Sequence, residues 1–129
     1  ICGSRGWLVP NTKTTKDDEK IFSRETLRLK LSIDAMNRTA EKRYRLGIMH
    51  YPPFSEGRAS SAFTDLFASS GVTKVVYGHL HGIKEQRCQD TEIDGVTYIN
   101  ASCDMLDFKL ILVDEIWAFE WGLRSQSLG

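Results

Sequence analysis

A strand, a helix and a second strand follow one another between residues 46 and 77, and this order limits the possible folds more than any other feature. Leu46 to Met49 is a short apolar run, typical of a strand covered on both faces. Pro52 and Pro53 end it, because proline has no N–H to donate to a neighbouring strand. Val72 to Tyr77 is a second such run. We therefore expect a βαβ unit with parallel strands and a right-handed connection.

The helix of this unit is predicted from its two ends and its apolar face. Ser60 or Ser61 can cap the start, since a serine hydroxyl accepts hydrogen bonds from the first free N–H groups of a helix. Gly71 marks the end, where glycine is common. The residues expected on the buried face are Ala62, Phe63, Leu66 and Phe67.

A longer helix is predicted ahead of this unit, from about Asp17 to Lys42. Its apolar stripe consists of Phe22, Leu29, Ile33 and Met36, with Thr26 and Ala40 filling the same face. Acidic residues at 17–19 and basic residues at the other end complement the helix dipole. Lys42, Arg43 and Arg45 are interpreted in this way, as a solvated face; phosphate binding by this cluster is the alternative.

The two ends of the chain suggest further strands. Residues 1–7 look like the end of a strand running into a glycine turn, so we expect a piece cut from a longer protein. Asp94-Gly95, between Thr91–Ile93 and Val96–Ile99, indicates a hairpin. Phe108 to Val113 is predicted to be another strand. Residues 114–129 do not fit this pattern and are interpreted as a tail of uncertain origin, with a short helix, a partner-binding tail and foreign sequence as the alternatives.

All three histidines of the chain lie at the carboxyl ends of the two predicted buried strands. His50 follows the first, and His79 and His81 follow the second. The carboxyl ends of parallel strands meet at one edge of a sheet, where ligands of such folds bind. Gly78 and Gly82 flank the pair and allow the chain to turn, so that the two rings can point at different places. Because neutral imidazole is a common metal ligand, we predict a metal site at this edge.

Composition narrows the class of protein. Seventeen basic residues balance seventeen acidic ones, so the net charge does not indicate nucleic acid or an anionic membrane as partner. The three cysteines are far apart in the sequence, which favours free thiols in a reducing compartment over a disulfide. There is no apolar run of about 20 residues that would span a bilayer, and no signal-peptide pattern. We expect a cytoplasmic protein of 129 residues with a core of its own.

Two motifs together resemble a known superfamily. Met49-His50-Tyr51-Pro52-Pro53, followed by Gly78-His79-Leu80-His81, is similar to the second half of a calcineurin-like metallophosphoesterase. The opening Gly3-Ser4-Arg5-Gly6-Trp7 resembles predicted bacterial phosphohydrolases of that superfamily. The resemblance implies that residues 1–113 are the C-terminal half of an αββα sandwich, an α/β fold with a mixed sheet and flanking helices. It also implies hydrolysis of a phosphomonoester or phosphodiester.

The resemblance further implies a site with two divalent ions, of manganese, iron, zinc or nickel. His50 and His79 would bind one ion and His81 the other. The other ligands of the family come from Asp-x-His, Gly-Asp and Gly-Asn-His motifs, and none of these occurs in the chain. We therefore expect the isolated chain to be inactive. Imidazoles without carboxylates form an undercharged site, so we expect weak binding that favours zinc or nickel over manganese.

Candidate substrate-binding residues lie next to the histidines. Arg5, Trp7 and Tyr51 can contact a small phosphorylated substrate, although turn formation and packing explain them as well. Tyr51 and Phe54 can flank an organic leaving group next to His50, but burial of the proline turn is the favoured interpretation of both. Asp104 and Asp107 follow Cys103 in a predicted loop and are interpreted as solvated acids, not as metal ligands.

Half of a two-sheet sandwich should leave one sheet face uncovered, so self-association through that face is expected. Two other functions compete with hydrolysis. One is a non-catalytic protein-binding scaffold with the phosphoesterase fold, and the other is a small metal-binding module. The complete set of three histidines speaks against the scaffold, and an open apolar face would speak against the module.

Overall fold

The computed structural model describes residues 1–39, 44–55, 57–82 and 90–115, which form one mixed sheet and two helices. The strands are β1 (Cys2–Ser4), β2 (Leu46–Met49), β3 (Lys74–Tyr77), β4 (Thr91–Ile93) and β5 (Val96–Asn100). The helices are α1 (Lys16–Thr39) and α2 (Ala62–Ser69). Neither described helix is long and apolar enough to cross a membrane. The general α/β class predicted from the sequence is therefore confirmed.

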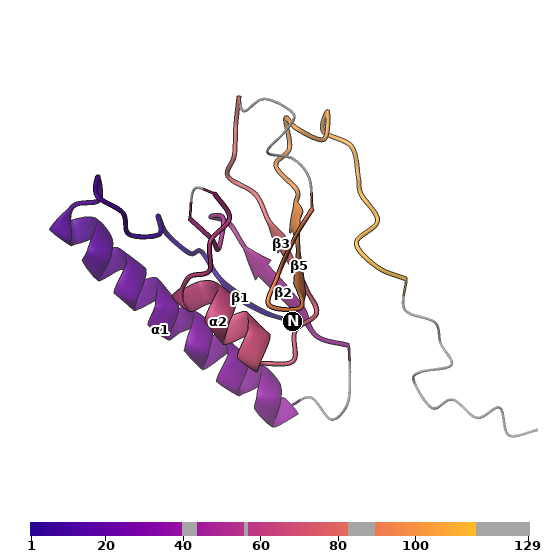
Figure 1. The fold of residues 1–129 in the computed structure, drawn as a ribbon. Helices are drawn as coiled ribbons and strands as arrows, with labels where there is room; N and C mark the ends of the chain where they lie inside the picture. Colours follow the sequence, from indigo (N-terminus) through magenta and orange to yellow (C-terminus); the bar gives the residue numbers. More distant parts are fainter. Residues whose placement is uncertain (40–43, 56, 83–89, 116–129) are drawn as a thin grey trace, which may run out of the picture.

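The sheet has the strand order β1-β2-β3-β5-β4 (Figure 1). Neighbours are parallel from β1 through β5, and only the edge strand β4 is antiparallel to its neighbour. This confirms the βαβ unit and the hairpin, in which Asp94 and Gly95 both have positive φ. It also adds a pairing that the sequence pattern did not predict, of β5 alongside β3.

Helix α1 begins and ends close to the predicted residues. Thr15 and Asp18 cap its start: Asp18 N–H donates to Thr15 Oγ1, and the Thr15 N–H and hydroxyl donate to the Asp18 carboxylate. Leu29, Ile33 and Met36 are buried as predicted, whereas Ala40 lies outside the described residues. The buried face also contains Glu25, which the apolar stripe did not include.

Helix α2 has the predicted ends. Ser61 is the N-cap: its hydroxyl accepts from Phe63 N–H, and the Thr64 side chain accepts from the Ser61 N–H in return. Gly71 follows the helix with φ 75°, a conformation that glycine adopts without steric cost.

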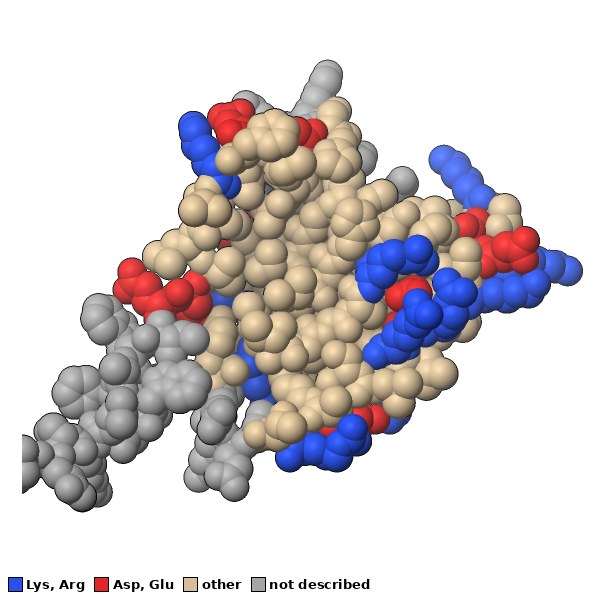
Figure 2. Space-filling model, turned by 180° about the vertical axis from the view of Figure 1, so that it is seen from behind, with Lys and Arg blue, Asp and Glu red and all other residues tan. Residues whose placement is uncertain are grey.

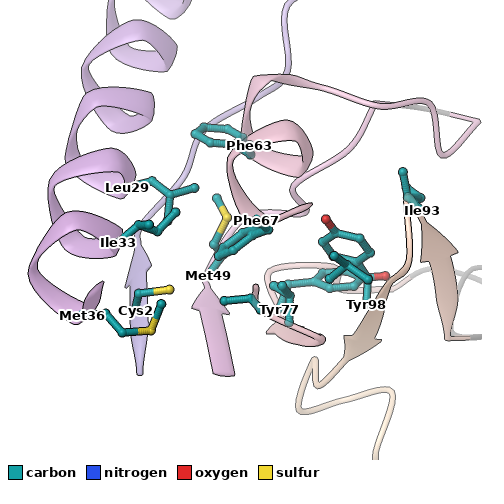
Figure 3. Packing of buried hydrophobic residues seen from close by; sticks show 13 residues of the cluster. Cys2, Leu29, Ile33, Met36, Met49, Phe63, Phe67, Tyr77, Ile93 and Tyr98 are labelled. Atoms are coloured by element: carbon teal, nitrogen blue, oxygen red, sulfur yellow. The ribbon is translucent and has the colours of Figure 1, made fainter. Parts of the chain in front are cut away.

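The core lies between the sheet and the two helices, which share one face of it (Figure 3). Leu29, Ile33 and Met36 of α1 and Phe63 and Phe67 of α2 meet the inward-facing strand side chains there. These strand residues include Cys2, Met49, Val75, Tyr77, Val96 and Tyr98. At about 25 cal/mol per Å² of buried apolar surface, this layer supplies the main stabilisation of the fold.

The sequence predicted that β2 is covered on both faces. In the described residues, the face of the sheet opposite the helices is left open at β2. Leu46 to Met49 alternates in burial, and Ile48 is 45% exposed. The expectation of a strand covered on both faces is therefore wrong for the described residues, because both described helices lie on the same side of the sheet. Seen from behind, the molecule presents a broad surface without charged side chains (Figure 2). This agrees with the expected uncovered sheet face.

Residues 108–113 do not form the predicted strand. Cys103 to Phe108 form a turn in which Asp107 and Phe108 have positive φ, and the chain then continues without ladder pairing. Leu110 is 101% exposed. A strand needs a partner for its N–H and C=O groups, and no described strand offers one here. Residues 116–129 of the predicted tail lie outside the described residues.

Candidate metal centre

The carboxyl ends of β2 and β3 bring two of the three histidines together. His50 comes directly after β2, and His79 lies two residues beyond β3. Their rings meet with His50 Nε2 3.0 Å from His79 Nδ1. The expected convergence of these two residues at one edge is therefore confirmed, although metal binding by them stays a prediction.

Backbone hydrogen bonds hold His50 from both neighbouring segments. Its N–H and that of Tyr51 donate to the Arg5 carbonyl, at 3.2 and 3.0 Å. Its own carbonyl accepts from Gly78 N–H at 3.1 Å. These hydrogen bonds connect the loops after β1, β2 and β3, and they fix the position of the His50 backbone.

His79 has a positive φ of 71°, in the left-handed region. Gly78, expected to provide the turn, has no positive φ, whereas Gly82 has φ 64°. The residue that adopts the left-handed conformation at this turn is therefore His79 itself. A non-glycine residue in this region costs about 1–2 kcal/mol. Such strain is often found at functional sites, where the surrounding structure imposes it.

The turn sends His81 to a different partner. Its Nδ1 lies 3.0 Å from Asp104 Oδ1, and Gly82 N–H donates to Asp104 Oδ2 at 2.9 Å. The Gly82 N–H and the His81 ring lower the pKa of Asp104 from its usual value. The interpretation of Asp104 as a merely solvated acid is therefore wrong, because its carboxylate contacts a predicted site residue.

The segment after β5 also supports this turn. Leu80 N–H donates to Ser102 Oγ, and the Ser102 N–H and hydroxyl donate to Asn100 Oδ1. Asn100 and Ser102 are buried. Cys103 and Asp104 follow them, so a third parallel strand contributes to the same edge. The signal that could have found these residues was β5 itself, whose carboxyl end carries polar side chains.

The environment of His79 favours the neutral ring. Partial burial lowers the pKa of His79 from its usual value, and the nearby His50 and His81 lower it further. The neutral form is the one that binds metals. Tyr51 packs against this ring with centroids 3.9 Å apart.

A pocket of about 630 Å³ opens beside His79. Its lining includes Trp7, Tyr51, Phe54, Arg58 and Tyr77. Trp7 and Tyr51, predicted to contact substrate, therefore line a real cavity next to a predicted metal ligand. Their ring centroids lie 5.0 Å apart.

Arg5 takes a different position from the other two candidate substrate residues. Its guanidinium stands over the Trp7 ring, 4.6 Å from the centroid. It also faces the buried carboxylate of Glu25, with Nη2 3.8 Å from Oε1. Arg5 is not among the residues that line the pocket, so the structure gives it a contact that orients Trp7.

Neither a comparison with models of protein families nor a search of curated proteins finds a match for this chain.

Proposed function

We propose that this chain provides the histidine-rich part of the site of a metal-dependent phosphoesterase of the calcineurin-like type. The observation that carries the proposal is the 3.0 Å approach of His50 Nε2 and His79 Nδ1 at the edge of a parallel sheet. The two residues come from separate βα turns, 29 positions apart. Their convergence is what the family resemblance requires of these two histidines.

The pair fits a divalent ion. Two nitrogens about 2.1 Å from one ion would lie about 3.0 Å apart in octahedral coordination and about 3.4 Å apart in tetrahedral coordination. The lowered pKa of His79 favours the neutral ring, which is the form that binds metals. A hydrogen bond between the rings explains the distance equally well without metal, so the decisive observation is metal binding itself.

A bound pair of ions would lower the pKa of a water molecule and stabilise the charge on the phosphoryl oxygens. The described residues would bind the substrate and position the metal ligands. Trp7 and Tyr51 line the pocket with apolar surface beside His79, which suits the organic part of a phosphoester. The carbonyl of Arg5 and the N–H of Gly78 hold His50 in place.

The other metal-binding motifs of that family do not occur in this sequence. The chain has three histidines, and all of them are in the two motifs named above. The motifs that supply the bridging carboxylate and the proton donor in that family are absent, so we propose that these two groups come from other segments. We propose that the 129-residue chain binds metal but hydrolyses phosphoesters only together with those segments.

The experiment is a metal-dependent hydrolysis assay on the protein expressed from its complete reading frame. p-Nitrophenyl phosphate and bis(p-nitrophenyl) phosphate serve as mono- and diester substrates. The expected result is activity that chelation removes and manganese, zinc or nickel restores. His50→Ala and His79→Ala should each lower kcat/KM at least about 100-fold. Lys30→Ala, at an exposed ion pair on α1, is the control and should change nothing. Activity that survives both histidine substitutions would refute the proposal.

A second candidate function is a non-catalytic protein-binding scaffold, and the open sheet face favours it. Ile48 is 45% exposed on this face, and Leu110 and Leu112 are exposed in the segment after β5. Large uncovered apolar surfaces mark interaction sites. A scaffold needs no metal, so full partner binding by a His50→Ala, His79→Ala double variant would support it.

A further inference from the structure

We propose that His81, Cys103 and Asp104 form a second metal site, of the type that binds zinc. One ligand atom from each residue lies within 4.8 Å of the other two. The proposed function already assigns His81 to a metal ion, and this proposal rests on it in that respect alone. What it adds is the two other ligands of that ion. The site itself can form whether or not the protein hydrolyses phosphoesters.

The three side chains are held together by the fold. Asp104 Oδ1 is 3.0 Å from His81 Nδ1, while the other oxygen, Oδ2, accepts from Gly82 N–H. The turn that carries Cys103 and Asp104 is closed by Leu106 N–H donating to the Ser102 carbonyl and Phe108 N–H donating to the Cys103 carbonyl. The donors therefore start close to one another, which lowers the entropy cost of gathering them around an ion.

The donor set identifies the class of metal. A thiolate, a carboxylate and a neutral imidazole carry two negative charges, which balance one divalent cation. Thiolate ligands select zinc or cobalt over manganese and magnesium. With three protein ligands, a tetrahedral ion keeps one position open to water. Cys103 and His81 are exposed, so an ion can reach the site from solvent.

This site changes the expectation drawn from the histidines alone. Three imidazoles would form a neutral site with weak binding, whereas this group supplies both an acid and a thiol. The His50–His79 pair and the His81 group are then chemically different. The first offers nitrogen only, and the second offers nitrogen, oxygen and sulfur.

A competing role for Asp104 must be separated from ligation. A carboxylate that accepts from Nδ1–H of a histidine fixes the tautomer and leaves Nε2 for a metal. In that case Asp104 would be a positioning residue for His81, and Cys103 would have no part. Sulfur coordination therefore distinguishes the two roles.

The test is an anaerobic titration of the reduced 129-residue protein with cobalt(II) chloride, followed by absorption spectroscopy. Thiolate coordination gives a sulfur-to-cobalt charge-transfer band in the near ultraviolet, and tetrahedral geometry gives intense visible bands. We expect both, saturating with one equivalent of cobalt and removed by zinc. Cys103→Ser should abolish the charge-transfer band, and Asp104→Asn should weaken cobalt binding at least about tenfold.

Two matched controls locate the sulfur and separate the sites. Cys2→Ser removes a buried thiol that belongs to the core and should leave the band in place. His50→Ala disables the other histidine pair and should also leave the band in place. No band in the unsubstituted protein, or a band that persists in Cys103→Ser, would overturn the proposal. Loss of the band in His50→Ala would show that the two groups of ligands do not form separate sites, and would overturn the proposal. A normal band in a protein that fails the hydrolysis assay would refute the phosphoesterase alone.

Discussion

Replacing His79 should reveal the backbone strain that this residue carries. At φ 71° a residue with a Cβ pays about 1–2 kcal/mol, which glycine avoids. Glycine loses about 0.5–1 kcal/mol more in conformational entropy on folding than alanine does. The difference predicts that His79→Gly is more stable than His79→Ala by roughly 0.5–1 kcal/mol. Both variants lack the imidazole, so the loss of its contacts cancels in the comparison.

His81 provides the matched control two residues away. It has an ordinary negative φ, so glycine should be worse than alanine there. We expect His81→Gly to be less stable than His81→Ala by about 0.5–1 kcal/mol. The sign of the Gly–Ala difference should therefore reverse between the two positions.

The measurement is urea unfolding of the four variants, followed by circular dichroism with a chelator present. Analysis as a two-state transition gives the free energy of unfolding of each variant. If His79→Gly proves less stable than His79→Ala, the left-handed conformation of this residue is wrong. The inference that the turn imposes strain on a metal ligand would then fail with it.

Three further predictions concern the cap, the packing and the open face. Hydrogen bonds from Thr15 and from Trp7 lower the pKa of Asp18 below its usual value of 3.8. The ionised carboxylate therefore stabilises the fold above that pH, and this stabilisation is lost as the pH falls through the lowered pKa. In acid unfolding, the stability of the unsubstituted protein relative to Asp18→Asn should decrease over that range. Gly47→Ala should cost about 1–3 kcal/mol in urea unfolding, because a Cβ would lie 2.7 Å from the Phe67 ring. Gly78→Ala, with its nearest neighbour at 4.0 Å, should be tolerated and is the control. Ile48→Lys should change the free energy of unfolding by less than about 0.5 kcal/mol, because the side chain is exposed. The same variant should self-associate less in size-exclusion chromatography. A large loss of stability would show that this face of the sheet is covered.

Local signals predicted the elements that depend on local interactions. The capping serine and Gly71 placed α2, and Asp94-Gly95 placed the hairpin between β4 and β5. These features are encoded by a few neighbouring residues, so the sequence is sufficient for them. The strand expected at 108–113 failed for the opposite reason. Apolar residues there supply the pattern of a strand, but a strand also needs a hydrogen-bonding partner, which composition cannot provide.

The sequence by itself determined that His50 and His79 would meet. Two neighbouring strands joined by a helix are expected to be parallel, and parallel strands bring their carboxyl ends to one edge. This is a rule of topology, and it needs no knowledge of side-chain packing.

Only the tertiary structure decided what His81 meets. Its partner Asp104 is 23 residues away and reaches it because β5 lies alongside β3. That pairing follows from competition among strands for positions in the sheet, which no local pattern records. The left-handed conformation of His79 likewise depends on this setting, because hydrogen bonds from Leu80 to Ser102 and from Gly82 to Asp104 hold the turn.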